Sequence, residues 1–270
     1  MRLGIGTYSF MWSIGFPGSQ PATPMSSLAL LARARELGVG VVQFGPNMQL
    51  EHLGEHELSQ LIQEAKRSNI ILEYGTRGLD PLHLKKHIGF ARQLSSSLLR
   101  TVPEFDVGCA PPLSVLADQL RTVLPDLEKS GVRLAIENGN LPSFALASLI
   151  RELNCPWVGV ALDTVNSLAV PEGIRQVVET LAPYAFSFHV KDFLVRRVWH
   201  RMGFVIEGRP AGKGQMEIEW ILSQLRSAGA NPNAILELWP PEQSRLERTI
   251  ALEHAWAKES IEYLRKYLPI

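Results

Sequence analysis

The sequence has few cysteines, no excess of charge of either sign and no long apolar run. Its 270 residues include two cysteines, and 27 basic residues balance 27 acidic ones. The two cysteines, Cys109 and Cys155, follow no paired motif, which excludes a disulfide scaffold. Zero net charge argues against a nucleic-acid partner, because binding to phosphates needs an excess of lysine and arginine. No run of about 18 apolar residues occurs, so we expect no membrane span.

The start of the chain also lacks a targeting signal. Residues 1–6 carry one positive charge but no unbroken apolar segment, so we expect no signal peptide. Together with the unpaired cysteines, this favours a reducing compartment and predicts a cytoplasmic protein. The chain is 46% hydrophobic and 20% charged, which is typical of a globular protein. No linker or shift in composition divides it, which predicts a single domain over residues 1–270.

Short apolar runs alternate with longer amphipathic stretches along the whole chain. The runs predict strands at residues 3–10, 39–44, 70–74, 98–102, 132–136, 158–162, 185–190 and 234–239. The longer stretches predict helices at about residues 23–37, 55–68, 80–95, 113–129, 144–153, 172–181, 218–228 and 245–267. Continuous apolar runs are typical of parallel strands that are covered on both faces. Eight strand–helix units of this size predict an α/β fold, a (β/α)₈ TIM barrel.

The main alternative is an open, doubly wound sheet. Such a sheet usually has a glycine-rich phosphate turn between its first strand and the next helix. Here Gly4 and Gly6 lie inside the first apolar run, and no G-x-G-x-x-G pattern opens a helix. The sequence therefore favours the barrel.

The last four apolar runs each end in a residue that can bind a metal. These residues are Glu137, Asp163, His189 and Glu237, at intervals of 26, 26 and 48 residues. One such residue alone is typical of a helix cap or a structural histidine. Four on consecutive strands indicate a site, because the carboxyl ends of barrel strands meet at one mouth. Three carboxylates and one imidazole predict one divalent metal ion, Mn²⁺ first, with Co²⁺, Mg²⁺ and Zn²⁺ as alternatives.

Around these residues the chain resembles the xylose isomerase-like TIM-barrel superfamily, in particular its sugar phosphate isomerase/epimerase branch. The matching segments are residues 136–138, 162–167, 188–192, 212–214 and 236–237. The resemblance implies a metal ion held by Glu137, Asp163, His189 and Glu237. It also implies that Glu137 and Glu237 form the catalytic acid/base pair, one on each face of the substrate.

Such a site suits chemistry that passes through an enediolate. A metal polarises a carbonyl, and a carboxylate within reach then removes the adjacent proton. We therefore expect a metal-dependent isomerase or epimerase. A lyase on the same scaffold is the alternative, since loss of CO₂ from a 3-oxo acid, or of water, leads to a related intermediate. The segment from His189 through residues 208–212 is similar to 3-oxo-isoapionate decarboxylases.

Two further functions are disfavoured. The superfamily also contains apurinic endonucleases, which hold three metals with additional histidines. Here Asn166, not histidine, stands three residues after Asp163, and the third strand ends without a histidine. A non-catalytic binding barrel is disfavoured by the intact set of four ligands.

Residues 193–215 form the longest predicted connection, which suggests a functional loop. Over residues 191–213, six basic residues face two acidic ones. Because arginine suits carboxylate and phosphate groups, we expect an anionic carbohydrate as the small-molecule substrate. A solvated basic loop or an oligomer contact is the alternative. The segment 212–214 could also bring backbone N–H groups to an anion at a helix start. The predicted substrate contacts here are Lys191, Arg197, Arg201, Arg209 and Lys213.

The first half of the chain offers fewer candidates. Arg100 lies inside an apolar run, and a buried charge needs a partner, either the substrate or Glu73. The predicted substrate contacts outside the basic segment are Tyr8, Trp12, Glu73, Arg100 and Asn166. The histidines at 52, 56, 83, 87 and 254 fall on or near helices and are expected at the surface. The C-terminal helix is expected either to pack on the barrel or to build a homo-oligomer.

Overall fold

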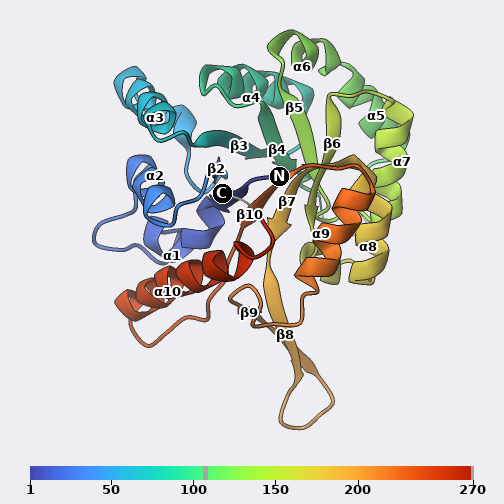
Figure 1. Ribbon diagram of the computed structural model, residues 1–270. Helices are drawn as coiled ribbons and strands as arrows, with labels where there is room; N and C mark the ends of the chain where they lie inside the picture. Colours follow the sequence, from blue (N-terminus) through green and yellow to red (C-terminus); the bar gives the residue numbers. More distant parts are fainter. Residues whose placement is uncertain (106–108, 269–270) are drawn as a thin grey trace.

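The chain folds into a closed barrel of eight parallel strands, which confirms the predicted fold (Figure 1). The computed structural model describes residues 1–105 and 109–268. Around the barrel the strand order is β1, β10, β7, β6, β5, β4, β3 and β2, and every neighbouring pair is parallel. The barrel strands are β1 (Leu3–Gly6), β2 (Val41–Phe44), β3 (Ile71–Arg77), β4 (Leu98–Val102), β5 (Arg133–Glu137), β6 (Val158–Asp163), β7 (Ala185–Val190) and β10 (Asn233–Leu236).

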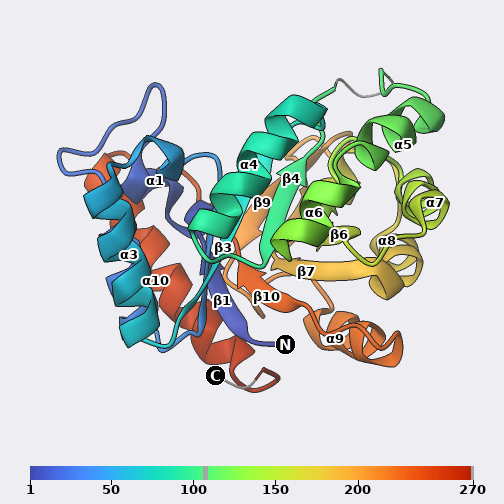
Figure 2. The same ribbon diagram turned by 90° about the horizontal axis from the view of Figure 1, so that it is seen from above.

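Helices surround the barrel on its outside (Figure 2). One predicted helix, residues 113–129, is divided in two. Pro125 in the first turn of the second part lacks an N–H group and clashes with the preceding turn, so the first part ends at Arg121. The α-helices are α1 (Met11–Ile14), α2 (Ser27–Glu36), α3 (Glu55–Arg67), α4 (Pro81–Gln93), α5 (Leu113–Arg121), α6 (Leu124–Ser130), α7 (Ser143–Leu153), α8 (Ile174–Leu181), α9 (Ile218–Ser227) and α10 (Leu246–Leu264).

Two strands end earlier than predicted, and both differences affect the mouth of the barrel. The first strand ends at Gly6 and continues as a 3₁₀ helix, η1 (Thr7–Phe10), which carries Tyr8 over the strand ends. The last strand ends at Leu236, so Glu237 follows β10 directly. Three more 3₁₀ helices are η2 (Leu50–His52), η3 (Asn166–Leu168) and η4 (Ala182–Tyr184).

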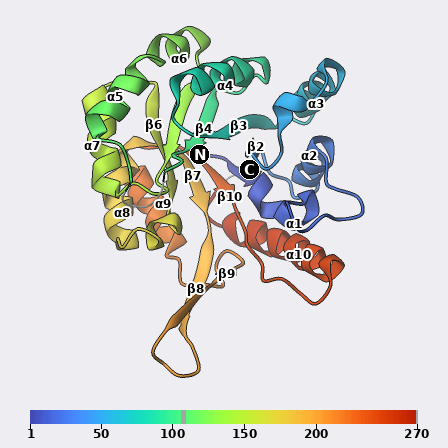
Figure 3. The ribbon, with the colours of Figure 1, turned by 180° about the vertical axis from the view of Figure 1, so that it is seen from behind.

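The predicted loop over residues 193–215 is wrong in part, because most of it is a β-hairpin. β8 (Asp192–Arg197) pairs antiparallel with β9 (Phe204–Arg209). The hairpin projects away from the barrel in two opposite views (Figures 1 and 3). Around its turn, Trp199, Met202 and Phe204 are exposed. The alternation of apolar and charged residues in this segment is thus the period-two pattern of a solvated hairpin.

The C-terminal helix packs on the barrel, which was one of its two predicted positions. α10 contacts α1, η1 and β10, and its Ile261 and Leu264 are buried. The start of β1 and the end of α10 lie on the same side of the barrel (Figure 2). No helix within the described ranges has the length and apolar character to cross a membrane.

One helix histidine was wrongly expected at the surface. His87 of α4 is 4% exposed, and its Nδ1 lies 2.7 Å from the hydroxyl of Tyr74. Burial lowers the pKa of His87 to about 4, so its ring is neutral at physiological pH. The side chain belongs to the packing between α4 and β3.

Candidate metal centre and active-site cavity

The four strand-end residues predicted as metal ligands come together at one mouth of the barrel. Glu137 and Asp163 are the last residues of β5 and β6. His189 is the register partner of Asp163 in β7, and Glu237 directly follows β10. All four are buried, with at most 2% of their surface exposed. The parallel topology therefore brings them to a similar depth.

Three of these side chains are close enough to share one cation. Single ligand atoms of Glu137, Asp163 and His189 all lie within 4.8 Å of one another. His189 Nδ1 is 3.3 Å from Glu137 Oε2, 3.7 Å from Asp163 Oδ2 and 3.7 Å from Glu237 Oε1. One imidazole nitrogen with carboxylate oxygens is a donor set for Mn²⁺, Co²⁺, Mg²⁺ or Zn²⁺. These residues could therefore hold a divalent metal.

Unpartnered atoms of the ligands also fit a cation. Within the described residues, Asp163 Oδ2, His189 Nδ1 and Glu237 Oε2 are buried and make no hydrogen bond. Lys191 Nζ lies 2.5 Å from Asp163 Oδ2 and 2.8 Å from Glu237 Oε2, but without hydrogen-bonding geometry. Buried polar atoms normally have partners, because leaving them without one costs free energy. Two of these oxygens therefore already meet one cation, the Lys191 ammonium, and a metal ion could be held by the same carboxylates.

Positive charge balances the buried carboxylates. Burial opposes the charge on Glu137, but Arg100, whose Nε lies 2.5 Å from Glu137 Oε2, acts together with His189 and Lys191 to hold the pKa of Glu137 well below its usual value. Burial also opposes an imidazolium at His189, but the carboxylates of Glu237 and Glu137 raise the pKa of His189 to about 10. A metal ion would take over the role of the His189 proton, since a metal ligand must release its proton.

Neighbouring amides orient the carboxylates. Asn166 Nδ2 donates to Glu137 Oε1 at 2.6 Å. Asp163 Oδ1 accepts from the backbone N–H groups of Val165 and Asn166, at 2.8 and 2.9 Å. Asn138 fixes the strand itself through two hydrogen bonds to the backbone of Asp163, at 2.6 and 2.7 Å. These contacts leave Glu137 Oε2 and Asp163 Oδ2 directed toward His189, as outer hydrogen bonds do in metal sites.

The inner side of His189 is held by a chain of hydrogen bonds inside the barrel. His189 Nε2 lies 2.8 Å from Gln43 Oε1. Gln43 Nε2 donates to Glu73 Oε2 at 2.8 Å, and Asn233 Nδ2 donates to Glu73 Oε1, also at 2.8 Å. Because Glu73 accepts from the NH₂ group of Gln43, the amide oxygen of Gln43 is turned toward His189. The structure thus places Glu73 beneath His189, and Glu73 is not among the residues that line the cavity at the strand ends.

A cavity of about 370 Å³ lies at these strand ends, which is a size suited to a small carbohydrate. It contains four of the predicted substrate contacts together with both predicted catalytic glutamates. Three cationic side chains face it, along with apolar walls. The lining residues are Tyr8, Met11, Arg77, Arg100, Val102, Glu137, Val165, Asn166, Lys191, Glu237, Leu238 and Trp239.

Trp12 and the hairpin arginines lie elsewhere among the described residues. The backbone N–H of Trp12 donates to Glu253 Oε1 at 2.9 Å, and its ring packs 5.1 Å from that of Phe16. Arg197 Nη1 donates to the backbone oxygen of Arg201 at 2.8 Å, within the hairpin turn. Neither arginine lines the cavity in this structure.

Acidic residues of the chain itself pair with the remaining basic residues of this segment. Arg209 Nη2 donates to Glu207 Oε2 at 2.7 Å, and Lys213 Nζ lies 3.4 Å from Glu259. Neither basic residue lines the cavity. Their role in substrate binding remains a prediction.

The glycine segment 212–214 binds a carboxylate, but the carboxylate belongs to this chain. The backbone N–H groups of Gly212 and Gly214 donate to Asp192 Oδ2 at 2.8 and 2.9 Å. Met216 N donates to the other oxygen at 3.0 Å. A Cβ at position 214 would lie 2.1 Å from Asp192, so only glycine fits there. The segment predicted to meet a substrate anion therefore closes the base of the hairpin.

The sequence reasoning missed Arg77, which lines the cavity from the last position of β3. The third strand was expected to end at Tyr74, three residues too early. A strand running to Arg77 would have placed this side chain at the mouth with the other strand-end residues. The apolar wall formed by Leu238 and Trp239 was also missed, although both directly follow Glu237.

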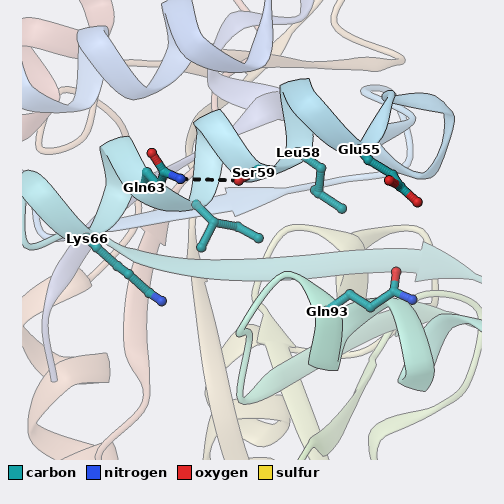
Figure 4. Close-up of a pocket in the computed structure, with 7 residues that line it drawn as sticks. Glu55, Leu58, Ser59, Gln63, Lys66 and Gln93 are labelled. Carbon is teal, nitrogen blue, oxygen red and sulfur yellow. Dashed lines mark hydrogen bonds between the residues drawn. The ribbon is translucent and has the colours of Figure 1, made fainter.

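A second depression lies outside the barrel, between α3 and α4 (Figure 4). Its lining includes one carboxylate, Glu55, and the apolar side chains of Leu58 and Ile62. Ser59 and Gln63 on its wall hydrogen-bond to each other at 3.3 Å. Its lining residues include neither histidine nor cysteine, the metal-binding side chains other than carboxylates.

Comparison with known proteins gives a family and a full-length relative. A family model described as "Xylose isomerase-like TIM barrel" matches residues 31–267. A 3-oxo-isoapionate decarboxylase of Pectobacterium atrosepticum is 32% identical over 266 residues. That match covers 98% of this chain and 95% of the relative.

Solved structures share the fold at low identity. A D-psicose 3-epimerase, solved in the presence of D-fructose, superposes with a TM-score of 0.73 and 16% identity over 99% of both chains. The IOLI protein, solved with a zinc atom, superposes with a TM-score of 0.73 and 17% identity over 100% of both chains. At such identities these matches speak for the architecture alone.

Proposed function

Because the chain belongs to the xylose isomerase-like TIM-barrel family, we propose that it is a divalent-metal-dependent decarboxylase of a 3-oxo sugar acid. The observation that carries this choice of reaction is the ion pair between Arg100 Nε and Glu137 Oε2, at 2.5 Å. The full-length likeness to a 3-oxo-isoapionate decarboxylase supports the same choice.

The Arg100–Glu137 pair bears on which bond the enzyme breaks. An epimerase needs a carboxylate that accepts a proton from carbon, and such a base works best with a pKa near the working pH. Burial opposes the charge on Glu137, but Arg100, His189 and Lys191 together hold the pKa of Glu137 well below its usual value. Loss of CO₂ needs no base, because the electron pair comes from the breaking carbon–carbon bond. The ion pair thus favours decarboxylation over proton abstraction at this carboxylate.

The residues of the chain supply what decarboxylation requires. A divalent cation bound at Glu137, Asp163, His189 and Glu237 would stabilise the negative charge that develops on the 3-oxo oxygen. The carbon that loses CO₂ becomes an enolate carbon and must then receive a proton. We assign this proton to Lys191, whose Nζ lines the cavity 2.8 Å from Glu237 Oε2.

Lys191 suits this role only once the carboxylates beside it bind a metal ion. Burial opposes the charge on Lys191, but the carboxylates of Asp163, Glu237 and Glu137 together raise its pKa. A cation held by the same two carboxylates would weaken their hold on the ammonium group and lower its pKa. Proton transfer from Lys191 leaves a neutral amine, which takes up a proton from water after CO₂ and the ketose have left.

The test is release of CO₂ from 3-oxo sugar acids, 3-oxo-isoapionate first, with Mn²⁺, Co²⁺, Mg²⁺ or Zn²⁺ added to chelator-treated protein. We expect stoichiometric CO₂ and a neutral ketose, and no reaction in excess chelator. The proposal fails if the loaded enzyme releases no CO₂ from any of these acids but exchanges a carbon-bound hydrogen of D-psicose or another ketose with deuterated water.

Isomerisation or 3-epimerisation, the reaction first expected from the strand ends, is the second candidate. One observation favours it: Glu137 and Glu237 both line the cavity, as the two predicted acid/base residues would. Deuterium exchange into ketoses and ketose phosphates, measured beside the CO₂ assay, separates the two reactions.

We also propose Mn²⁺ as the resident metal, an anionic carbohydrate as substrate and a cytoplasmic location. Mixed nitrogen and oxygen ligands fit Mn²⁺, and Cys109 and Cys155 are both free in the structure. Elemental analysis of protein purified without added metal tests whether Mn²⁺ is the resident metal.

A homo-oligomer remains a prediction, which light scattering would test.

A further inference from the structure

Two arginines from neighbouring strands enter the same cavity. Arg100 of β4 is the register partner of Gly75 in β3, and Arg77 lies two residues beyond Gly75. Residues two apart in a strand point to the same face, so Arg77 stands one layer nearer the mouth than Arg100. A Cβ at position 75 would lie 3.4 Å from Arg100 Cδ, an ordinary van der Waals distance, so the stem of Arg100 runs directly past Gly75.

Tyr8 lies between the two guanidinium groups. Arg77 Nη2 donates to the Tyr8 hydroxyl at 3.0 Å. The guanidinium carbon of Arg100 lies 5.9 Å from the centre of the Tyr8 ring. All three side chains line the cavity, so η1, β3 and β4 together build one cationic corner of it.

Both arginines have N–H groups left for a ligand. Arg100 is 4% exposed and uses Nε for Glu137, but its buried Nη1 has no partner among the described residues. Arg77 faces Glu104 at 3.9 Å, beyond hydrogen-bonding distance, and both of these side chains are more than half exposed. A guanidinium carries five N–H donors, and within residues 1–105 and 109–268 the polar contacts of Arg77 are with this carboxylate and the Tyr8 hydroxyl, which use few of them.

We propose that Arg77, Tyr8 and Arg100 form a carboxylate-binding subsite, and that Arg77 gives the enzyme its preference for sugar acids over neutral sugars. This inference rests on the proposed function, since it names the residue that recognises the acid group of the substrate. Arginine suits the task because its planar fork can bind both oxygens of a carboxylate. Tyr8 holds this fork at the rim, above the metal ligands.

The reaction itself sets how Arg77 should affect kinetics. The charge of the carboxylate disappears as CO₂ forms, so Arg77 stabilises the bound substrate at least as well as the transition state. An interaction of this kind lowers KM without raising kcat. Arg77 is thus a specificity-determining residue, and its loss should leave kcat unchanged or higher.

The experiment compares two probes of equal length on the Mn²⁺-loaded enzyme by calorimetry. Erythronate is a four-carbon sugar acid, and erythritol is the matching neutral polyol. We expect the wild type to bind erythronate more tightly, and Arg77→Ala to weaken erythronate about 10-fold, in keeping with a half-exposed charged hydrogen bond. Erythritol should be unaffected. Arg77→Lys should recover part of the affinity, because the charge remains and the fork is lost.

The matched control is Arg67→Ala, at the exposed end of α3, where Arg67 lies 3.8 Å from Glu64. It should change neither affinity. Equal weakening of both probes by Arg77→Ala, or of neither, overturns the subsite. Failure of the subsite can be distinguished from failure of the proposed reaction. If erythronate binding depends on Arg77 but no CO₂ is released, the proposed reaction is wrong and the subsite stands. If Arg77→Ala releases CO₂ with an unchanged KM, the subsite is wrong and the proposed reaction stands.

Discussion

Gln43 Oε1 lies 2.8 Å from His189 Nε2, inside the barrel. This is the side of the ring away from Glu137, Asp163 and Glu237, which lie near Nδ1. An amide oxygen only accepts hydrogen bonds, so it selects the ring form that carries its proton on Nε2. The lone pair of the neutral ring is then on Nδ1, the atom 3.3 Å from Glu137. Glu73 secures this arrangement, because it accepts from the Gln43 amide at 2.8 Å.

We predict that Gln43→Leu weakens metal binding about 10-fold, the usual lower range for loss of a hydrogen bond behind a ligand histidine. The measurement is calorimetric titration of chelator-treated protein with Mn²⁺. Gln63→Leu, on the outer face of α3, is the matched control and should bind Mn²⁺ as the wild type does. An unchanged affinity in Gln43→Leu would show that the ring is positioned by its packing alone.

The second prediction concerns Arg100 and stability. Arg100→Met leaves Glu137 buried without the cation that now lies 2.5 Å away. Breaking a buried pair in this way typically destabilises a protein by about 3–5 kcal/mol. A bound metal would restore a positive neighbour for Glu137, so the loss should be smaller in the loaded protein.

Urea denaturation with and without Mn²⁺ measures both values for Arg100→Met. The control is Arg121→Met, since Arg121 pairs with Asp118 and Glu152 at the surface. That change should cost at most about 1 kcal/mol, with or without metal. Equal destabilisation of the Arg100 variant in both conditions contradicts a metal beside Glu137.

The third prediction separates ligand roles from acid/base roles. Glu137→Gln and Glu237→Gln should each lower turnover at least about 100-fold, because each removes a charge at the centre of the site. Elemental analysis of each variant then shows whether the metal was lost with the activity. If both variants keep full turnover, neither the mechanism nor the ligand assignment holds.

Much of the fold could be predicted because the barrel is encoded locally. Each strand is an apolar run, each helix is amphipathic, and the spacing of 26 residues is one structural unit. The strand-end rule then placed Glu137, Asp163, His189 and Glu237 at one mouth without any knowledge of distances. The boundaries at residues 98–102 and 185–190 agree with β4 and β7.

The remaining features of the candidate site depend on contacts between residues far apart in sequence, which no local pattern contains. Gln43 meets His189 only because the barrel closes and brings β2 across from β7. The excess of positive charge over residues 191–213 also did not predict which basic residues line the cavity. Arg209 pairs with Glu207 of the same segment, and Lys213 pairs with Glu259, a partner that lies 46 residues away in sequence.

The last prediction concerns Glu253, which joins α10 to the segment after η1. Its carboxylate is fully buried and accepts from Trp12 N, Ser13 N and Ser13 Oγ at 2.9, 3.0 and 2.7 Å. Burial outweighs these hydrogen bonds and raises the pKa of Glu253 to about 7. Between its ordinary pKa of about 4.5 and 7, the folded protein therefore holds more protons than the unfolded chain. Stability should fall as the pH rises through this window.

Glu253→Gln removes this titration and keeps an acceptor for the same segment. The free energy of unfolding is measured for both proteins by urea denaturation at pH 5 and pH 8. Relative to the wild type, the variant should be more stable at pH 8 than it is at pH 5. Burial lowers the pKa of the neighbouring His254, so stability also falls on acidification, but this effect is common to both proteins and cancels in the difference. Glu247→Gln, at the exposed start of α10, should leave the difference unchanged. A constant difference between wild type and Glu253→Gln across the two pH values would mean that Glu253 is ionised throughout and that its three hydrogen bonds outweigh its burial.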